Sequence, residues 1–216
     1  RRGYAMVLML LGSIVISFSG LAIRNIETAD NWQINFYRSI AFGLSISIVL
    51  LFRYGKTGPQ QLKGIGLEGI LAAMLLASAS ISFLLAITNT TVAATTFTLS
   101  SIPFLTAIMA WLFLGERIGK STILTICIAA GGISLMFVQG FGSGTLYGNF
   151  MALLCAIGFS SYAIIIRRNR RLEMLPTLIL SNLIMMLVAL VFTWNNLLIS
   201  WNDLLICFIL GGLLSA

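Results

Sequence analysis

Long apolar runs separated by short polar breaks make up nearly the whole chain. A helix needs about 20 mostly apolar residues to cross the hydrocarbon core, which is about 30 Å thick, because each residue rises about 1.5 Å. Seven runs predict complete spans, at 4–23, 34–52, 66–87, 92–114, 122–138, 147–166 and 175–193. An eighth run begins near Leu204 and reaches Ala216 without being long enough to span. The pattern predicts an all-α, polytopic membrane helical bundle with seven complete helices and a partial eighth, cut from a longer protein.

Polar residues at two of the breaks carry helix-start signals. Asp30-Asn31-Trp32-Gln33 predicts an N-cap to which the residue three positions later reaches back, and Ser200-Trp201-Asn202-Asp203 predicts a similar start for the eighth run. The glycine-rich segment 140–144 follows no predicted strand, so we interpret it as a linker between two membrane helices.

Composition narrows the class of protein. Of 216 residues 59% are apolar and 9% are charged, against about 25% charged in an average soluble domain. This excludes an ordinary soluble enzyme, a disordered chain and a nucleic-acid-binding domain. The sequence has no His, so we expect no His-based metal site or general base, and no cofactor. Cys127, Cys155 and Cys207 each sit in an apolar run, and we expect them to be buried small hydrophobic residues.

The basic residues indicate an orientation. With the N-terminus in the cytoplasm, 11 of the 13 Lys and Arg residues fall on the inner side: Arg1, Arg2, Arg53, Lys56, Lys63, Arg117, Lys120, Arg167, Arg168, Arg170 and Arg171. Only Arg24 and Arg38 fall on the outer half. The positive-inside rule therefore predicts a cytoplasmic N-terminus. We expect a multi-pass protein of a bacterial inner membrane. We interpret the cluster 167–171 as a topology determinant rather than a nucleic-acid or lipid patch.

The chain also resembles itself. Gly3-x-x-Met6-x-Leu8 aligns with Gly148-x-x-Met151-x-Leu153, and the segment 67–73 aligns with 210–216. Five predicted helices separate corresponding points, so the second copy must be inverted in the membrane relative to the first. We therefore predict a first five-helix repeat at 1–140 and an incomplete second repeat at 145–216. Inverted repeats of this kind are typical of secondary transporters, whose solute site lies between the halves.

The segment 86–137 resembles the EamA type of the drug/metabolite transporter superfamily. The features that carry the likeness are the small and hydroxyl residues opening the fourth run, then Pro103, Leu114-Gly115-Glu116-Arg117 and the glycine pair at 131–132. Phe36-Tyr37-Arg38 resembles an arginine-bearing motif of the same family, although Ser181-Asn182-Leu183 stands where a second copy would place an arginine. The resemblance implies ten helices in two inverted repeats, and amino acids or related metabolites as solutes.

Arg38 is the one charge clearly inside a predicted span, and with Tyr37 it is a candidate for binding solute. A fixed positive charge at a cavity mouth would attract a carboxylate or phosphate. The alternative is a structural arginine paired with Glu27, Asp30 or backbone carbonyls. The sequence leaves both open.

Hydroxyl residues in the fourth run are further candidates. Spacings of four and three place Thr91, Thr95 and Thr98 on one helix face, where they would contact a solute or line a wet cavity. The alternative is that each hydroxyl bonds the carbonyl four residues back or joins two helices.

Pro103 should bend its helix and leave the Leu99 carbonyl without its helical bond, which membranes tolerate where protein or water supplies a donor. Beside the end of that helix, Glu116 and Arg117 are candidates for a gating or packing ion pair. Weaker candidates for the cavity wall are Ser82 in the third run, Tyr162 in the sixth and Asn182 in the seventh.

Together these features predict an integral membrane secondary transporter, and no enzyme, that exports a small polar or amphipathic, amino-acid-like metabolite by alternating access. The alternatives are a membrane-embedded enzyme acting on lipid or peptide, and a non-transporting subunit of a membrane complex. The expected partners are a small-molecule solute and the lipid bilayer, with no nucleic acid; monomer and homodimer both stay open. No acidic residue occupies the middle of a predicted span, which favours a facilitator or exchanger or places the coupling group elsewhere.

Overall fold

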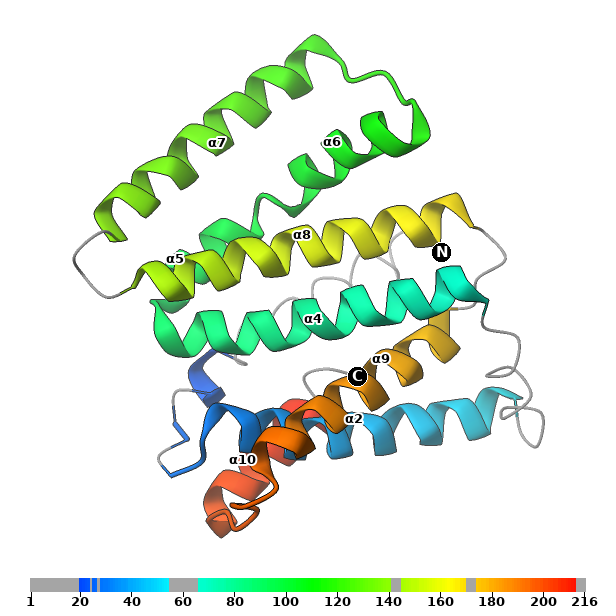
Figure 1. Ribbon diagram of the computed structural model, residues 1–216, viewed down its shortest axis with the longest axis vertical. Coiled ribbons are helices and arrows are strands. Elements are labelled where there is room, and N and C mark those ends of the chain that lie inside the picture. The colour runs from blue at the N-terminus through cyan, green and yellow to red at the C-terminus, as the bar shows by residue number, and fades with distance from the viewer. Residues whose placement is uncertain are drawn as a thin grey trace, which may run out of the picture. The chain divides into compact units, whose positions relative to one another are not determined.

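The computed structural model describes residues 20–23, 25–26, 28–54, 66–140, 145–169 and 174–212, and within them it is helical, without a strand. The labelled helices (Figure 1) are α2 (Asn31–Tyr54), α4 (Leu67–Asn89), α5 (Val92–Leu99), α6 (Ile102–Leu114), α7 (Lys120–Gly140), α8 (Leu146–Arg168), α9 (Met174–Thr193) and α10 (Trp201–Gly212). The expected all-α fold is confirmed. Of the first expected span, 4–23, only residues 20–23 belong to the described part.

Five segments are long and apolar enough to cross a membrane: Asn31–Leu50, Leu67–Asn89, Val92–Leu114, Leu146–Arg168 and Met174–Thr193. They coincide with five of the expected runs. Two shorter apolar helices, Lys120–Leu135 and Trp201–Gly212, occupy the fifth and eighth runs. Large apolar side chains such as Leu67 and Val191 are exposed at 85% and 75%, as lipid-facing residues of a polytopic bundle are.

The helices form two compact units, which are described separately. The first unit comprises residues 1–55 and 186–216, and the second comprises residues 56–185. Each unit contains segments of both predicted repeats, so the unit boundaries differ from the predicted repeat boundaries. The first repeat motif, at residues 3–8, and the end of the second, at 213–216, lie outside the described residues. The inverted repeat therefore stays a prediction.

In the second unit, α8 packs along α4 more extensively than along any other helix. Small buried residues line both helices at this contact: Ala72, Ala73, Ala79 and Ala86 on α4, and Ala152, Ala156 and Gly158 on α8. A Cβ atom on Gly158 would lie 2.9 Å from the Cβ of Ala79. Because lipid removes the hydrophobic drive for helix association, such close backbone approach supplies the attraction through van der Waals contacts.

In the first unit, α2 and α10 pack together. The N-cap predicted at Asp30 is confirmed, because the Asp30 N–H donates to Gln33 Oε1 at 2.7 Å. At the start of α10, the expected reach from Asp203 back to Ser200 stays a prediction. The buried Asp203 carboxylate accepts from the N–H groups of Thr28 at 3.0 Å and Ala29 at 3.1 Å, and from the Thr28 hydroxyl. Asp203 thus ties α10 to the segment that precedes α2.

The expectation that all three cysteines are buried is wrong for Cys127. Cys155 and Cys207 are buried, but Cys127 is exposed on α7. Most residues of α7 are exposed because this helix contacts its neighbours α5, α6 and α8 only lightly. In a membrane such a surface faces lipid, so an apolar pattern alone does not separate a core position from a lipid-facing one.

Replacing Gly148 with alanine should destabilise the α4–α8 pair. The added Cβ would lie 2.6 Å from the Asn89 carbonyl carbon and 2.7 Å from the Thr90 nitrogen, and backbone atoms cannot move aside as a flexible side chain can. We expect Gly148→Ala to lower the free energy of unfolding by about 1 to 3 kcal/mol, measured by denaturation of the purified protein in detergent.

The matched control is Gly131→Ala on α7. Gly131 is exposed and a Cβ there meets no atom within 4 Å, so its stability should be unchanged or slightly higher, since alanine favours helix over glycine. Equal stability of the two variants would contradict the close helix contact.

Candidate functional site

The site begins at a break in the fourth expected span. The sequence predicts one helix bent at Pro103, but the structure has two helices, α5 and α6, separated at Ser100 and Ser101. Pro103 lies in the first turn of α6, where its missing N–H and fixed φ are tolerated. The predicted bend is thus a break, and it occurs before the proline because a first turn accommodates proline better than a helix interior does.

Hydroxyl groups bond the backbone around this break. Ser100 Oγ donates to the Phe97 carbonyl and Ser101 Oγ donates to the Thr98 carbonyl, each at 2.6 Å. From α8, Ser160 Oγ lies 3.2 Å from the Ile102 carbonyl, which also accepts from the Thr106 hydroxyl at 2.7 Å. The Phe97 and Thr98 carbonyls also accept from the backbone N–H groups of Ser100 and Ser101, at 3.2 and 3.1 Å, so the hydroxyls add a second bond to carbonyls at the break.

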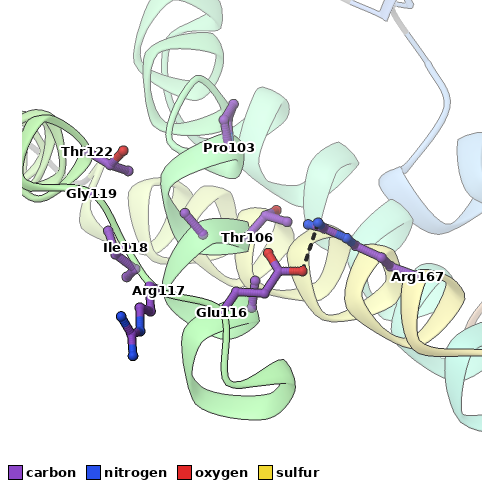
Figure 2. A pocket seen from close by; sticks show the side chains of 10 residues that line it. Pro103, Thr106, Glu116, Arg117, Ile118, Gly119, Thr122 and Arg167 are labelled. Atoms are coloured by element: carbon purple, nitrogen blue, oxygen red, sulfur yellow. Dashed lines mark ion pairs between the residues drawn. The ribbon is translucent and has the colours of Figure 1, made fainter.

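A pocket of about 240 Å³ opens beside α6, in the second unit (Figure 2). The residues of α6 that line the pocket are spaced three or four positions apart and therefore form a stripe on one face of the helix. The other walls are the turn after α6, the start of α7 and the end of α8. The lining residues are Pro103, Thr106, Ala107, Ala110, Glu116, Arg117, Ile118, Gly119, Thr122 and Arg167. The start of α6, where Pro103 lies, therefore borders a pocket.

The charged residues lie at the turn end of the pocket. Gly115 adopts the left-handed conformation, with φ of 68°, and ends α6, so the chain turns toward α8. Glu116 Oε1 then lies 2.8 Å from Arg167 Nη2, with 43% and 55% of the two side chains exposed. The expected partner, Arg117, projects away from Glu116 in Figure 2. The acidic residue is thus paired with an arginine 51 positions later and not with its neighbour.

A second polar contact holds the same end of α8. Asn169 Nδ2 donates to Glu68 Oε2, at the start of α4, over 2.9 Å. At the opposite end of α8, the buried Thr90 hydroxyl donates to Asn149 Oδ1 at 2.9 Å. Helix α8, which the sequence assigns to the second repeat, is therefore bonded at both ends to segments of the first.

The threonine candidates lie outside the pocket. Thr95 and Thr98 are fully buried, and their hydroxyls donate to the carbonyls of Thr91 and Ala94, four residues back. Thr91 is exposed and caps α5 by accepting from the Ala94 N–H at 3.0 Å. The local-carbonyl alternative thus describes the bonds seen, and solute binding by these residues stays a prediction.

Arg38 and Tyr37 belong to the first unit. Arg38 is 8% exposed and its Nη2 lies 3.4 Å from Asn35 Oδ1 on the same helix, a side-chain partner that the sequence did not suggest. The Tyr37 hydroxyl donates to the Leu197 carbonyl at 2.5 Å. Gln33 bonds the neighbouring carbonyls of Asn196 and Leu198, so α2 fixes the segment before α10.

The remaining candidates occupy three different helices. Ser82 on α4 and Asn182 on α9 are buried, and Tyr162 on α8 is half-buried, with a hydroxyl that has no partner among the described residues. None of the three lines the pocket. The structure thus gathers the expected gating residues, Pro103, Glu116 and Arg117, but not the expected solute-binding residues.

Sequence reasoning missed Arg167, Thr106 and Thr122 as pocket residues. Thr106 shares the stripe of Pro103 and Ala110, so the helical spacing could have shown it. Arg167 carries no such signal, because only the tertiary fold brings the end of α8 to the turn after α6.

Comparison with known proteins adds one match. A model of the EamA-like transporter family matches residues 3–138, a range that includes the interrupted span, the turn after α6 and most of α7. Neither the curated proteins nor the solved structures contain a match to the chain.

The pocket predicts a difference in thiol labelling along the interrupted span. In a variant whose Cys127, Cys155 and Cys207 are replaced by alanine, we expect Thr106→Cys to react with a membrane-impermeant maleimide. The control, Thr98→Cys, should be protected because Thr98 is 1% exposed and does not line this pocket. Labelling is measured by mass shift in native vesicles of both orientations, and equal protection of the two cysteines would contradict an open pocket.

Proposed function

Because the chain belongs to the EamA-like transporter family, we propose that it exports a small polar or amphipathic, amino-acid-like metabolite by alternating access. The proposed protein is a multi-pass carrier of a bacterial inner membrane, with its N-terminus in the cytoplasm, and is not an enzyme. The family match and the five apolar spans support membrane transport itself.

The observation that carries the proposal is the pocket beside the interrupted span. It combines an apolar floor, hydroxyls of Thr106 and Thr122 and a charged mouth, which is the mixture that small-molecule sites use for contact area and orientation. Its volume of about 240 Å³ lies below the roughly 300 to 1,000 Å³ of drug-sized pockets, and therefore suits a small metabolite.

The charges at the mouth support an opening toward the cytoplasm. Arg117, Lys120 and Arg167 lie at this end of the second unit, around the turn after α6. By the positive-inside rule these residues face the cytoplasm, so the pocket is open on the side from which an exporter loads its solute.

The ion pair between Glu116 and Arg167 is the proposed gate. Since both side chains are about half exposed, the pair contributes no more than about 1 kcal/mol, and an exporter can break it in every cycle at little cost. The α4–α8 pair is packed too closely to slide, whereas α7 contacts its neighbours lightly. Helix α6 is held to α8 by its packing and by the bond from Ser160 to the Ile102 carbonyl. Helix α7 is therefore the proposed moving part, with the turn after α6 as its hinge.

Transport in proteoliposomes tests the proposal. We expect the full-length protein to exchange radiolabelled amino acids or related metabolites by counterflow, with liposomes lacking protein as the control. A transported solute should also slow the labelling of Thr106→Cys, because it occupies the pocket or closes its mouth. Absence of transport across a broad metabolite panel, with correctly inserted protein, would contradict the proposal.

Replacing Arg38 tests the solute-binding role proposed for the first unit. We expect Arg38→Ala to reduce transport about tenfold or more at normal membrane levels, because a buried guanidinium that attracts an anionic solute group is lost. Ser47→Ala on the exposed part of the same helix is the control and should transport normally. If Arg38→Ala retained full transport, Arg38 would be a structural residue.

A further inference from the structure

The charges of the residues that line the pocket do not sum to zero. Glu116 contributes one negative charge, and Arg117 and Arg167 contribute one positive charge each, so the lining carries a net charge of +1. These charged side chains are exposed or half-exposed, so the net charge acts as a positive potential that attracts anions and not as a buried charge. An occupant with one net negative charge makes the filled pocket neutral, whereas a zwitterion leaves the charge uncompensated.

Glu116 is placed to compete with such an occupant. It holds the Arg167 guanidinium at 2.8 Å, and roughly half of each side chain is exposed to the pocket mouth. Because an exposed pair of this kind is weak, a solute carboxylate can take the place of Glu116 on Arg167. Arg117, on the other side of the turn, adds a second positive charge at the mouth (Figure 2).

The uncharged residues of the lining restrict the kind of solute body that can carry the negative charge. Pro103, Ala107, Ala110 and Ile118 offer apolar contact, and the hydroxyls of Thr106 and Thr122 offer the other polar side-chain groups of the lining. Glu116 is the one carboxylate of this lining that an ammonium group could reach, and the two arginines of the same lining oppose a cation there.

We propose that Arg167 is the specificity-determining residue of this pocket, which selects a monoanionic solute with a small apolar body, and that Glu116 is its intramolecular competitor. This inference rests on the proposed function, since it concerns the solute of the same pocket. It narrows the amino-acid-like class to members that bind through a carboxylate without a compensating ammonium.

Four compounds with one common body test the inference: phenylpropionate, phenylpropionamide, phenylalanine and phenethylamine, which are anionic, neutral, zwitterionic and cationic. Binding to the full-length protein in detergent is measured by the rise in melting temperature with ligand concentration. We expect phenylpropionate to bind most tightly of the four.

Removing Glu116 and removing Arg167 should change the affinity for phenylpropionate in opposite directions. If the ion pair were merely structural, both changes would have the same effect. Glu116→Gln should tighten phenylpropionate binding up to about fivefold, because the competitor is gone, while Arg167→Gln weakens it by a similar factor or more. Arg167→Lys should recover part of the loss. The control is Arg168→Gln, the adjacent arginine, which lies outside the pocket lining and should bind as the unmodified protein does.

Two results would overturn the inference: phenylalanine binding more tightly than phenylpropionate, or Glu116→Gln and Arg167→Gln weakening phenylpropionate binding alike. Transport of the same compounds separates this from the proposed function. If the protein binds anions selectively but transports no solute, the proposed transport function is wrong and the anion-selective pocket stands. If it transports solutes without charge selection, only the proposed anion selectivity is wrong.

Discussion

The close approach of α8 to α4 is the contact on which the second unit depends. It requires glycine at positions 148 and 158, since a Cβ on either residue would lie within 3 Å of atoms of Asn89 or Ala79 on α4. The same contact fixes the position of α8 along its own axis relative to α4. Ser160 then reaches the Ile102 carbonyl at the interrupted span, and Arg167 reaches Glu116 at the pocket mouth. A bulkier α4–α8 contact would displace both.

Bilayers penalise unsatisfied backbone groups, and this constraint explains why the interruption and the pocket occur together. The proline at the start of α6 removes one N–H, and serine and threonine hydroxyls bond nearby carbonyls. The stripe of α6 that lines the pocket carries proline, alanines and one threonine, so α6 offers little side-chain volume on that side. Small side chains on that stripe leave the space that becomes the pocket.

The strength of the contacts divides the second unit into a fixed and a movable part. Backbone-to-backbone packing at the α4–α8 contact resists sliding, whereas the exposed ion pair at the mouth contributes little free energy and is readily replaced. A carrier needs both properties, since one helix pair must keep its geometry while a neighbouring helix moves. The proposed competition between Glu116 and a solute anion uses the same weak pair, so binding of solute and opening of the mouth would be coupled.

Local sequence determined the membrane class, the helical fold, most helix bounds and the N-cap at Asp30, because apolar length and capping chemistry act over a few residues. It also marked Pro103, Glu116 and Arg117, which the pocket brings together. It did not determine the partner of Glu116, the exposure of Cys127 or the burial of Thr95 and Thr98 away from the pocket. These depend on which helices meet, and in lipid both core-facing and lipid-facing positions are apolar, so hydrophobic periodicity carries little information about packing. Only the tertiary structure, by placing the end of α8 against the turn after α6, decided where the charges of this protein come together.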